Sequence, residues 1–322
     1  VEAGVFEPVE TELAIDADDV VLATGSRPLA LPGNPFAGAL IDSTQALELN
    51  TLPSSAVIIG AGAVALEFAS LWNAAGCEVT LLIRKDRVLS TWERRASMTL
   101  TRELKRRGVN VIARTAVDRV DTGANLGATV HYRQGDSDED RIAYGEVVLA
   151  AIGRVPNTDA DWFRSSGLKL DERGYVTVDG YGRTNLDGVW ALGDITPGHA
   201  LAHRAFEQGI TIAEKIAGAD PKPVLDDTVP QVVFSFPEAA SVGLTLDQAK
   251  AREDVVEPKE TAYPMLSNAR MLMSGEGGSM TVVSGAFANN PDMQVVLGVH
   301  IVSPIASDLI AEAEQLVGNR VP

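Results

Sequence analysis

The chain reads AVIIGAGAVALE at residues 56–67, an apolar run that breaks into two glycines and resumes as a helical pattern. This order predicts a strand, a tight turn and a helix. Gly60 and Gly62 let the backbone turn sharply and approach a pyrophosphate, and Ala65 is small enough for the helix to pack on the strand. The helix N-terminus offers free N–H groups to the anion. With a second apolar strand at 78–83, the spacing predicts a dinucleotide-binding loop, and a bare glycine-rich turn is the alternative.

The end of that second strand determines which dinucleotide fits. An acidic residue there accepts the ribose 2′-OH, whereas a basic cluster accommodates a 2′-phosphate. The sequence has apolar Ile83 at this position, followed by cationic Arg84 and Lys85. These residues favour NADPH over NADH, because guanidinium and ammonium groups bind a phosphate. A solvated basic turn is the alternative.

Composition limits the class of protein. A chain of 322 residues with 45% hydrophobic content is long enough for two or three domains. No apolar run reaches membrane-spanning length and the N-terminus lacks the pattern of a signal peptide, so we expect a cytoplasmic protein outside the membrane. A net charge of −17 argues against a nucleic-acid partner. We predict no metal site.

The only cysteine, Cys77, precludes a disulfide within the chain. It stands at the entry to an apolar strand, with no histidine near it in sequence. We therefore interpret Cys77 as a packed thiol rather than a nucleophile.

Strands and helices alternate through the first half of the chain, which indicates a parallel α/β sheet, whereas strands in succession after residue 226 indicate an α+β domain. Apolar periodicity predicts strands at 10–15, 20–23, 56–60, 78–83, 110–113, 116–121, 128–133, 147–151, 189–192, 231–235, 240–244, 255–263, 279–284 and 293–302. Helices are expected at 42–49, 63–75, 94–107, 201–217, 247–252 and 307–316.

A further strand at 189–192 ends in Gly193 and Asp194. An Asp at the carboxyl end of a strand lies where open α/β sheets bind ligands, and its carboxylate can accept hydrogen bonds from a ribose or ribityl chain. Capping of the next helix is the alternative role for Asp194.

Four of these stretches, in this order and spacing, resemble the pyridine nucleotide-disulphide oxidoreductase family of flavoproteins. They are ATG at 23–25, GAGAVALE at 60–67, AIGR at 151–154 and VWALGD at 189–194. The resemblance implies an FAD domain in two pieces (1–52 and 155–225), an inserted Rossmann-like NAD(P) domain (53–154) and a C-terminal α+β interface domain (226–322). It implies a homodimer, with FAD and a nicotinamide dinucleotide as cofactors. The cofactor-binding positions that it implies are Thr24, Gly25, Gly60, Gly62, Ala65, Glu67, Gly153, Arg154, Gly193 and Asp194.

Within the family, LAHRA at 201–205 and VHIVSPIASDLI at 299–310 are most similar to dihydrolipoamide dehydrogenases. That similarity implies that Leu201, Ala202 and His203 lie near the flavin, and a packed or solvated histidine is the alternative for His203. Glu67 matches the family glutamate that pairs with a lysine beside the flavin. A first-turn glutamate favoured by the helix dipole is the alternative.

Three family features do not occur in these 322 residues: a first glycine-rich FAD loop, the redox cysteine pair and the catalytic His-Glu pair in a His-Pro segment. We therefore expect a fragment of a larger enzyme with no catalytic residue of its own, a weak FAD half-site, and a Glu67 that turns to solvent. The IRK sequence at 83–85 instead resembles the NADPH-using glutathione reductases, although Ser90 occupies their second basic position.

The resemblance implies that the parent enzyme is an FAD-dependent dithiol–disulphide oxidoreductase that passes hydride between NAD(P) and flavin. A mycothione or glutathione reductase and a flavin transhydrogenase are close alternatives. A non-catalytic nucleotide-binding and dimerisation module is the alternative from another class.

Overall fold

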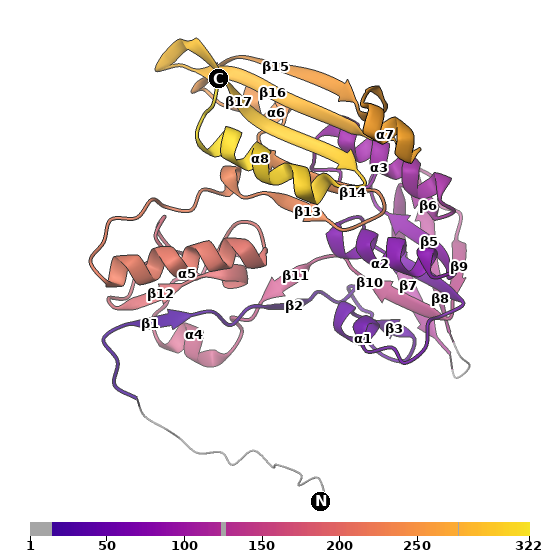
Figure 1. Cartoon of the computed structure of the whole chain (residues 1–322). Helices are drawn as coiled ribbons and strands as arrows, with labels where there is room; N and C mark the ends of the chain where they lie inside the picture. Colours follow the sequence, from indigo (N-terminus) through magenta and orange to yellow (C-terminus); the bar gives the residue numbers. More distant parts are fainter. Residues whose placement is uncertain (1–14, 124–126, 276) are drawn as a thin grey trace, which may run out of the picture. The chain divides into compact units, whose positions relative to one another are not determined.

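The computed structural model describes residues 15–123, 127–275 and 277–322 (Figure 1). The chain divides into two compact units. Unit 1 joins Val1–Gly25 to Thr158–Pro223, and unit 2 joins Ser26–Asn157 to Val224–Pro322. Both contain helices and strands, which confirms the predicted α/β class. The strand expected at 10–15 lies outside the described residues except for Ile15, which is not in a strand.

Unit 1 contains a two-stranded parallel sheet, in which Val20 pairs with Val189 and Leu22 with Ala191. Its hydrophobic core includes Phe163 and Ile195. The elements of unit 1 are β1 (Val20–Leu22), α4 (Asp161–Ser165), β12 (Val189–Ala191), η1 (Gly193–Ile195) and α5 (Ala202–Ile216).

The first part of unit 2 is a five-stranded parallel sheet in the order β3-β10-β4-β5-β6, which is the predicted Rossmann-like architecture. A separate antiparallel sheet, β7-β8-β9, follows β6 in the chain. The elements here are β2 (Ser26–Pro28), β3 (Leu40–Ile41), α1 (Ser43–Leu47), β4 (Ser55–Ile59), α2 (Ala63–Ala74), β5 (Glu78–Ile83), α3 (Arg94–Arg106), β6 (Asn110–Ala113), β7 (Thr115–Thr122), β8 (Ala128–Gln134), β9 (Arg141–Gly145), β10 (Val147–Ala150) and β11 (Arg154–Pro156).

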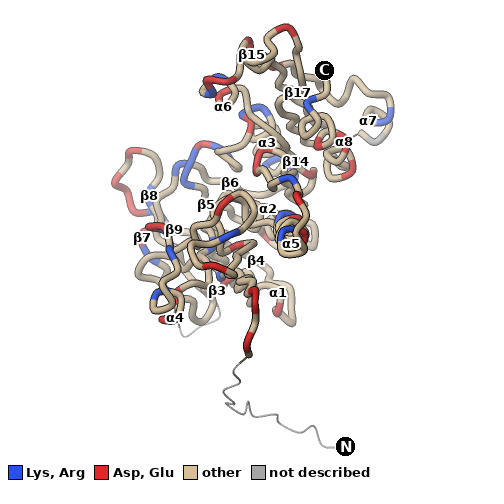
Figure 2. The backbone as a smooth tube through the Cα atoms, turned by 90° about the vertical axis from the view of Figure 1, so that its left-hand side faces the viewer, with Lys and Arg blue, Asp and Glu red and all other residues tan. Residues whose placement is uncertain are grey.

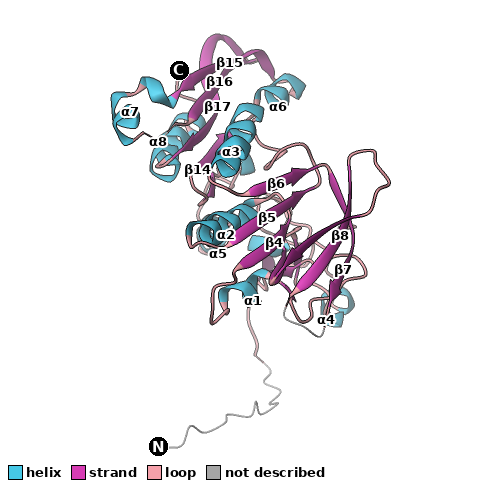
Figure 3. Cartoon of the chain, turned by 90° about the vertical axis from the view of Figure 1, so that its right-hand side faces the viewer, coloured by secondary structure: helices cyan, strands magenta, loops and turns pink. Residues whose placement is uncertain are grey.

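The two faces of the parallel sheet are covered by different layers (Figure 3). Alternate residues of a strand point to opposite faces. Ile58 and Leu81 pack with α2 and α3 on one face, whereas Val57 and Leu82 pack against β8 on the other. Burial of both faces explains why β4 and β5 are continuous apolar runs.

The second part of unit 2 is an antiparallel sheet in the order β13-β14-β17-β16-β15, flanked by helices, as expected for the α+β interface domain. Its elements are η2 (Asp226–Thr228), β13 (Gln231–Val233), β14 (Glu238–Gly243), α6 (Leu246–Ala251), β15 (Val255–Pro264), η3 (Met265–Ser267), α7 (Ala269–Ser274), β16 (Ser279–Phe287), β17 (Asn290–Ser303) and α8 (Ala306–Gly318).

The apolar side of α8 is already covered within the chain. Ile310, Ala313 and Val317 pack on Val242 and Ile301 of the sheet. The outer side of the helix is polar and exposed.

The two parts of unit 2 share a hydrophobic core. Val233, Ala239 and Val302 of the antiparallel sheet join the same cluster of buried residues as α2 and α3. The end of β13 is also tied to α2, because Phe236 N–H donates to Ser70 Oγ at 3.1 Å. The Rossmann-like domain and the interface domain thus form one packed body within unit 2.

Candidate functional site

The glycine-rich loop between β4 and α2 has the predicted tight turn. Gly60 adopts φ +144°, and a Cβ there would lie 2.2 Å from the Ala151 carbonyl oxygen and 3.3 Å from Ala65 Cβ. Ala65 itself is fully buried. Only glycine fits at residue 60, because both the backbone conformation and the contact with β10 exclude a side chain.

The N-terminus of α2 is open to a ligand. Gly62 is the N-cap residue, and it is exposed in an extended conformation with φ −91°. No atom lies within 4 Å of the position that its Cβ would occupy, and among the described residues no side chain caps this helix. The first amides of α2 therefore have no intrahelical acceptor and can donate to an anion. This cradle fits the pyrophosphate of a dinucleotide.

The loop after β5 carries two basic residues at the surface. Ile83 is fully buried and contributes only apolar surface, whereas Arg84 and Lys85 are exposed. The loop that carries them is held against the glycine-rich turn, because Leu89 N–H donates to the Ala61 carbonyl at 2.9 Å. Sequence reasoning missed this contact, since a backbone hydrogen bond leaves no residue signature.

The expectation that Glu67 turns to solvent is wrong. Its side chain is half-buried, and its Oε1 accepts a hydrogen bond of 3.0 Å from Phe234 N–H. A backbone donor at the end of β13 thus satisfies this carboxylate. Glu67 is the fifth residue of α2, and its hydrogen bond to Phe234 joins this helix to the interface domain.

The predicted cofactor-binding residues at 24–25 and 153–154 each include one glycine with a positive φ. Gly153 adopts φ +144° and its carbonyl accepts from Leu29 N–H at 3.0 Å. Arg154 donates from both Nε and Nη2 to Ser26, each at 2.7 Å, and so ties β11 to β2. Thr24 is exposed, and Gly25 has φ +71°. These contacts of Arg154 hold two strands of unit 2 together.

The predicted flavin residues of unit 1 gather at η1 and the first turn of α5. Gly193 N–H donates to Gln208 Oε1 at 2.8 Å, which joins the two elements. Asp194 is half-buried in η1 rather than at a helix N-cap. Leu201 is the N-cap of α5, and Ala202 and His203 are exposed on its first turn.

The described residues contain no group of three His, Cys, Asp or Glu side chains that could hold a metal ion. Within the same residues, no helix is long and apolar enough to cross a membrane. Acidic residues are spread along both units, with basic ones between them (Figure 2).

Two family models match the chain. The pyridine nucleotide-disulphide oxidoreductase model matches residues 3–209, and the model of the dimerisation domain of these enzymes matches residues 229–322. The two matches follow the order that the sequence motifs imply, with the dimerisation domain after the nucleotide-binding part.

Curated relatives are named dihydrolipoyl dehydrogenase. The protein from Cupriavidus necator is 36% identical over 302 residues, which cover 93% of this chain and 61% of the relative. The protein from Geobacillus stearothermophilus is 37% identical over 300 residues, which cover 91% of this chain and 60% of the relative. The chain thus spans about three fifths of the length of the relatives it matches.

Two solved structures are also similar to this chain. LpdA from Mycobacterium tuberculosis superposes with a TM-score of 0.83 at 30% identity, covering 95% of this chain and 64% of that structure. The flavoprotein disulfide reductase RclA from Escherichia coli has a TM-score of 0.81 at 24% identity, which shows a shared fold. From these matches and from the glycine-rich loop, we conclude that the chain belongs to the pyridine nucleotide-disulphide oxidoreductase family.

Proposed function

We propose that this chain is part of a dihydrolipoyl dehydrogenase-like flavoprotein that uses NADPH in preference to NADH. The nucleotide site carries the proposal: an open helix N-terminus at Gly62, a buried Ile83 where a ribose-binding carboxylate would stand, and exposed Arg84 and Lys85 beside the loop. The relatives supply the enzyme class.

We propose FAD-binding pieces at 1–52 and 155–225, an NAD(P) domain at 53–154 and an interface domain at 226–322, with residues 26–52 of the first piece packed in the same compact unit as the NAD(P) domain. FAD, when bound, supplies the acceptor for a hydride from the nicotinamide. In this proposal the chain's own residues bind and orient: α2 amides hold the pyrophosphate, Arg84 and Lys85 hold the 2′-phosphate, and Asp194 holds a ribityl hydroxyl.

Reduction of a disulphide needs a pair of thiols, and this chain has one cysteine, Cys77, which is buried. We therefore assign the dithiol of the proposed enzyme to cysteines that are not among these 322 residues. The purified chain alone should show no lipoamide reduction above background. Lipoamide, glutathione disulphide and mycothione given to the whole enzyme would separate the possible substrates.

Nucleotide titration tests the NADPH preference. We expect wild type to bind NADPH at least about tenfold more tightly than NADH, because one charge-assisted contact contributes roughly 1.5–3 kcal/mol. Arg84→Ala should remove most of this difference and leave NADH affinity unchanged. Lys105→Ala, which removes the same charge from the exposed last turn of α3, is the matched control. Equal affinities in wild type, unaltered by Arg84→Ala, would contradict the proposal.

A further inference from the structure

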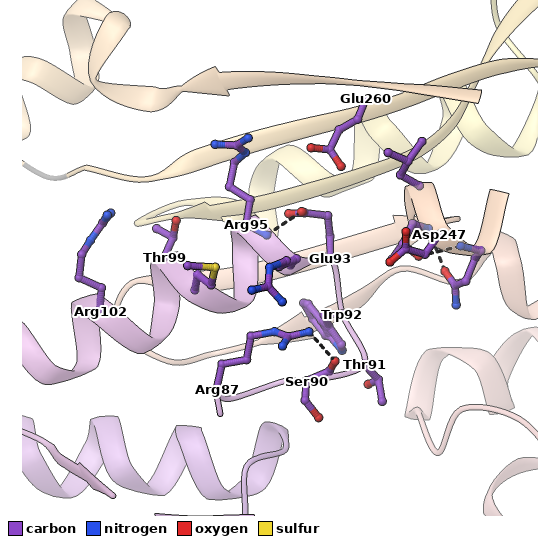
Figure 4. Close-up of a pocket in the computed structure, with 15 residues that line it drawn as sticks. Arg87, Ser90, Thr91, Trp92, Glu93, Arg95, Thr99, Arg102, Asp247 and Glu260 are labelled. Carbon is purple, nitrogen blue, oxygen red and sulfur yellow. Dashed lines mark hydrogen bonds between the residues drawn. The ribbon is translucent and has the colours of Figure 1, made fainter. Parts of the chain in front are cut away.

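Unit 2 contains a cavity that is lined by none of the residues of the glycine-rich turn. Its volume is about 830 Å³, and it lies between the N-terminal half of α3 and residues of α6 and β15 (Figure 4). Arginines dominate its lining: Arg87, Arg94, Arg95 and Arg102. A concentration of guanidinium groups is notable in a chain with a net charge of −17.

Three of these arginines come from one side of α3. Residues seven positions apart on a helix are separated by about two turns, so Arg95 and Arg102 lie on the same face, with Arg94 next to Arg95. In the part of the chain that the structure describes, no carboxylate forms an ion pair with Arg94 or Arg95. Arg102 has one loose ion pair, 3.6 Å from Glu103, and Glu103 binds Arg106 more closely at 2.7 Å.

The fourth arginine forms part of the wall. Arg87 donates to Asp86 Oδ1 at 2.9 Å and to the Ser90 carbonyl at 3.2 Å. Its Nε is buried and has no hydrogen-bond partner in the described structure. The charge available to a ligand therefore comes mainly from the three arginines of α3.

Three carboxylates also line the cavity, Glu93, Asp247 and Glu260, and among the described residues none of them forms an ion pair with the three arginines of α3. Glu93 is 4% exposed, and its two oxygens accept from Arg95 N–H at 2.6 Å and Ala96 N–H at 2.7 Å, so it caps α3. Glu260 reaches into the same space as Arg95 (Figure 4). Burial, followed by the nearby Glu93 carboxylate, raises the pKa of Glu260.

We propose that this cavity binds a ligand with two or more phosphate groups, held by Arg94, Arg95 and Arg102. Guanidinium groups bind phosphate oxygens through paired N–H donors, and the volume exceeds that of a single phosphate. Trp92 also lines the cavity, so an aromatic base attached to the phosphates has a ring to stack on. The residues that line this cavity include none from the α2 N-terminus, although Ser90 belongs to the loop that contacts the glycine-rich turn.

Calorimetric titration of the full chain with inorganic pyrophosphate tests the proposal. We expect saturable binding that Arg95→Gln and Arg102→Gln each weaken about tenfold, since each removes one charge-assisted contact. Lys105→Gln removes the same charge from α3 outside the cavity and should leave the affinity within about twofold. No saturable binding, or equal weakening by Lys105→Gln, would overturn the proposal.

A substitution that is expected to increase the affinity distinguishes loss of binding from loss of folding. Glu260→Gln removes a negative charge that faces Arg95, so pyrophosphate should bind several-fold more tightly. A misfolded protein cannot produce this gain. Unchanged or weaker binding by Glu260→Gln would count against the site.

Saturating NADPH distinguishes this cavity from the glycine-rich loop. Pyrophosphate bound between α3 and β15 should remain when NADPH is present and in Arg84→Ala, whereas pyrophosphate bound at α2 would be displaced, which would overturn the proposal. ATP then identifies the source of the phosphates. Tighter binding of ATP than of pyrophosphate, reduced by Trp92→Leu, indicates a nucleotide, and equal binding indicates a free polyphosphate.

Discussion

At the scale of single residues, burial determines the reactivity of Cys77. The side chain is 3% exposed, and its thiol donates to the Glu78 carbonyl at 3.7 Å. Burial, followed by the charges of Glu146 and Glu78, raises the pKa of the thiol to about 11. At pH 8 only about one molecule in a thousand carries the reactive thiolate.

We therefore predict that Cys77 reacts with a chromogenic disulphide reagent at least about a hundredfold more slowly in the native chain than in urea. Absorbance of the released thiolate measures both rates. Cys77→Ser, which should release none, is the control. Rapid reaction of the native protein would show that the thiol is accessible.

His300 is a buried residue whose protonation opposes folding. It is 1% exposed, with Nδ1 2.7 Å from Ser241 Oγ and Nε2 3.2 Å from the Leu244 carbonyl. A carbonyl only accepts, so Nε2 carries the proton and Nδ1 accepts from the Ser241 hydroxyl. Burial lowers the pKa of His300 below its usual 6.5.

This shift predicts how stability depends on pH. Below pH 6.5 the unfolded chain binds a proton at His300 while the folded chain does not, so the unfolding free energy falls as pH decreases. The contribution is at most about 1.4 kcal/mol per pH unit. Urea denaturation between pH 7.5 and 5 measures it. His300→Gln, which cannot titrate, should have a shallower slope, and an identical slope would refute this role.

At the scale of elements, the β4–α2 turn separates a glycine needed for folding from one needed for binding. Gly60→Ala places a Cβ 2.2 Å from the Ala151 carbonyl at φ +144°. We expect it to lower the unfolding free energy by more than about 2 kcal/mol, because both strain and a backbone clash result. Thermal or urea denaturation checks this loss.

We expect Gly62→Ser, unlike Gly60→Ala, to retain the stability of the protein but to lower its affinity for NADPH. Residue 62 has an extended N-cap conformation with open space around its Cβ, and serine is a preferred N-cap residue. Stability should stay within about 0.5 kcal/mol of wild type or rise. NADPH affinity should fall about tenfold or more, since the hydroxyl takes the amides that the pyrophosphate needs. Unchanged NADPH binding by Gly62→Ser would place the pyrophosphate elsewhere.

At the scale of the whole molecule, the matched dimerisation domain leads us to predict a homodimer. The outer side of α8 is polar, but Leu272 and Met273 of α7 are 65% and 82% exposed. Apolar side chains exposed together are typical of interaction surfaces. We expect these two residues to contribute to the contact between subunits.

Light scattering at micromolar concentration should give twice the 34.1 kDa mass of the chain. Met273→Asp should shift the protein toward the monomer, because burial of a charge in an interface is unfavourable. Ile142→Asp changes a residue that is 64% exposed on β9 and should leave the dimer intact. A monomeric wild type would contradict this prediction.

Much of the architecture could be predicted because its signals are local. A glycine that must adopt φ +144°, a small Ala65 under the turn and a continuous apolar strand are properties of neighbouring residues. The same applies to α1, a predicted helix that begins with a capping box formed by Asp42 and Gln45. Short strands such as β2 and β11 were missed, since three residues carry no periodicity.

The motifs and periodicity in the sequence were thus enough to predict the family, the longer strands and helices, and the tight glycine-rich turn, because turn and pairing preferences act over a few residues. The packing of complete elements was needed to show that Glu67 binds Phe234, 167 positions away, and that α3 arginines face Glu260 across a cavity. These contacts depend on how complete elements pack, and no local propensity encodes the partner that a side chain meets across a domain.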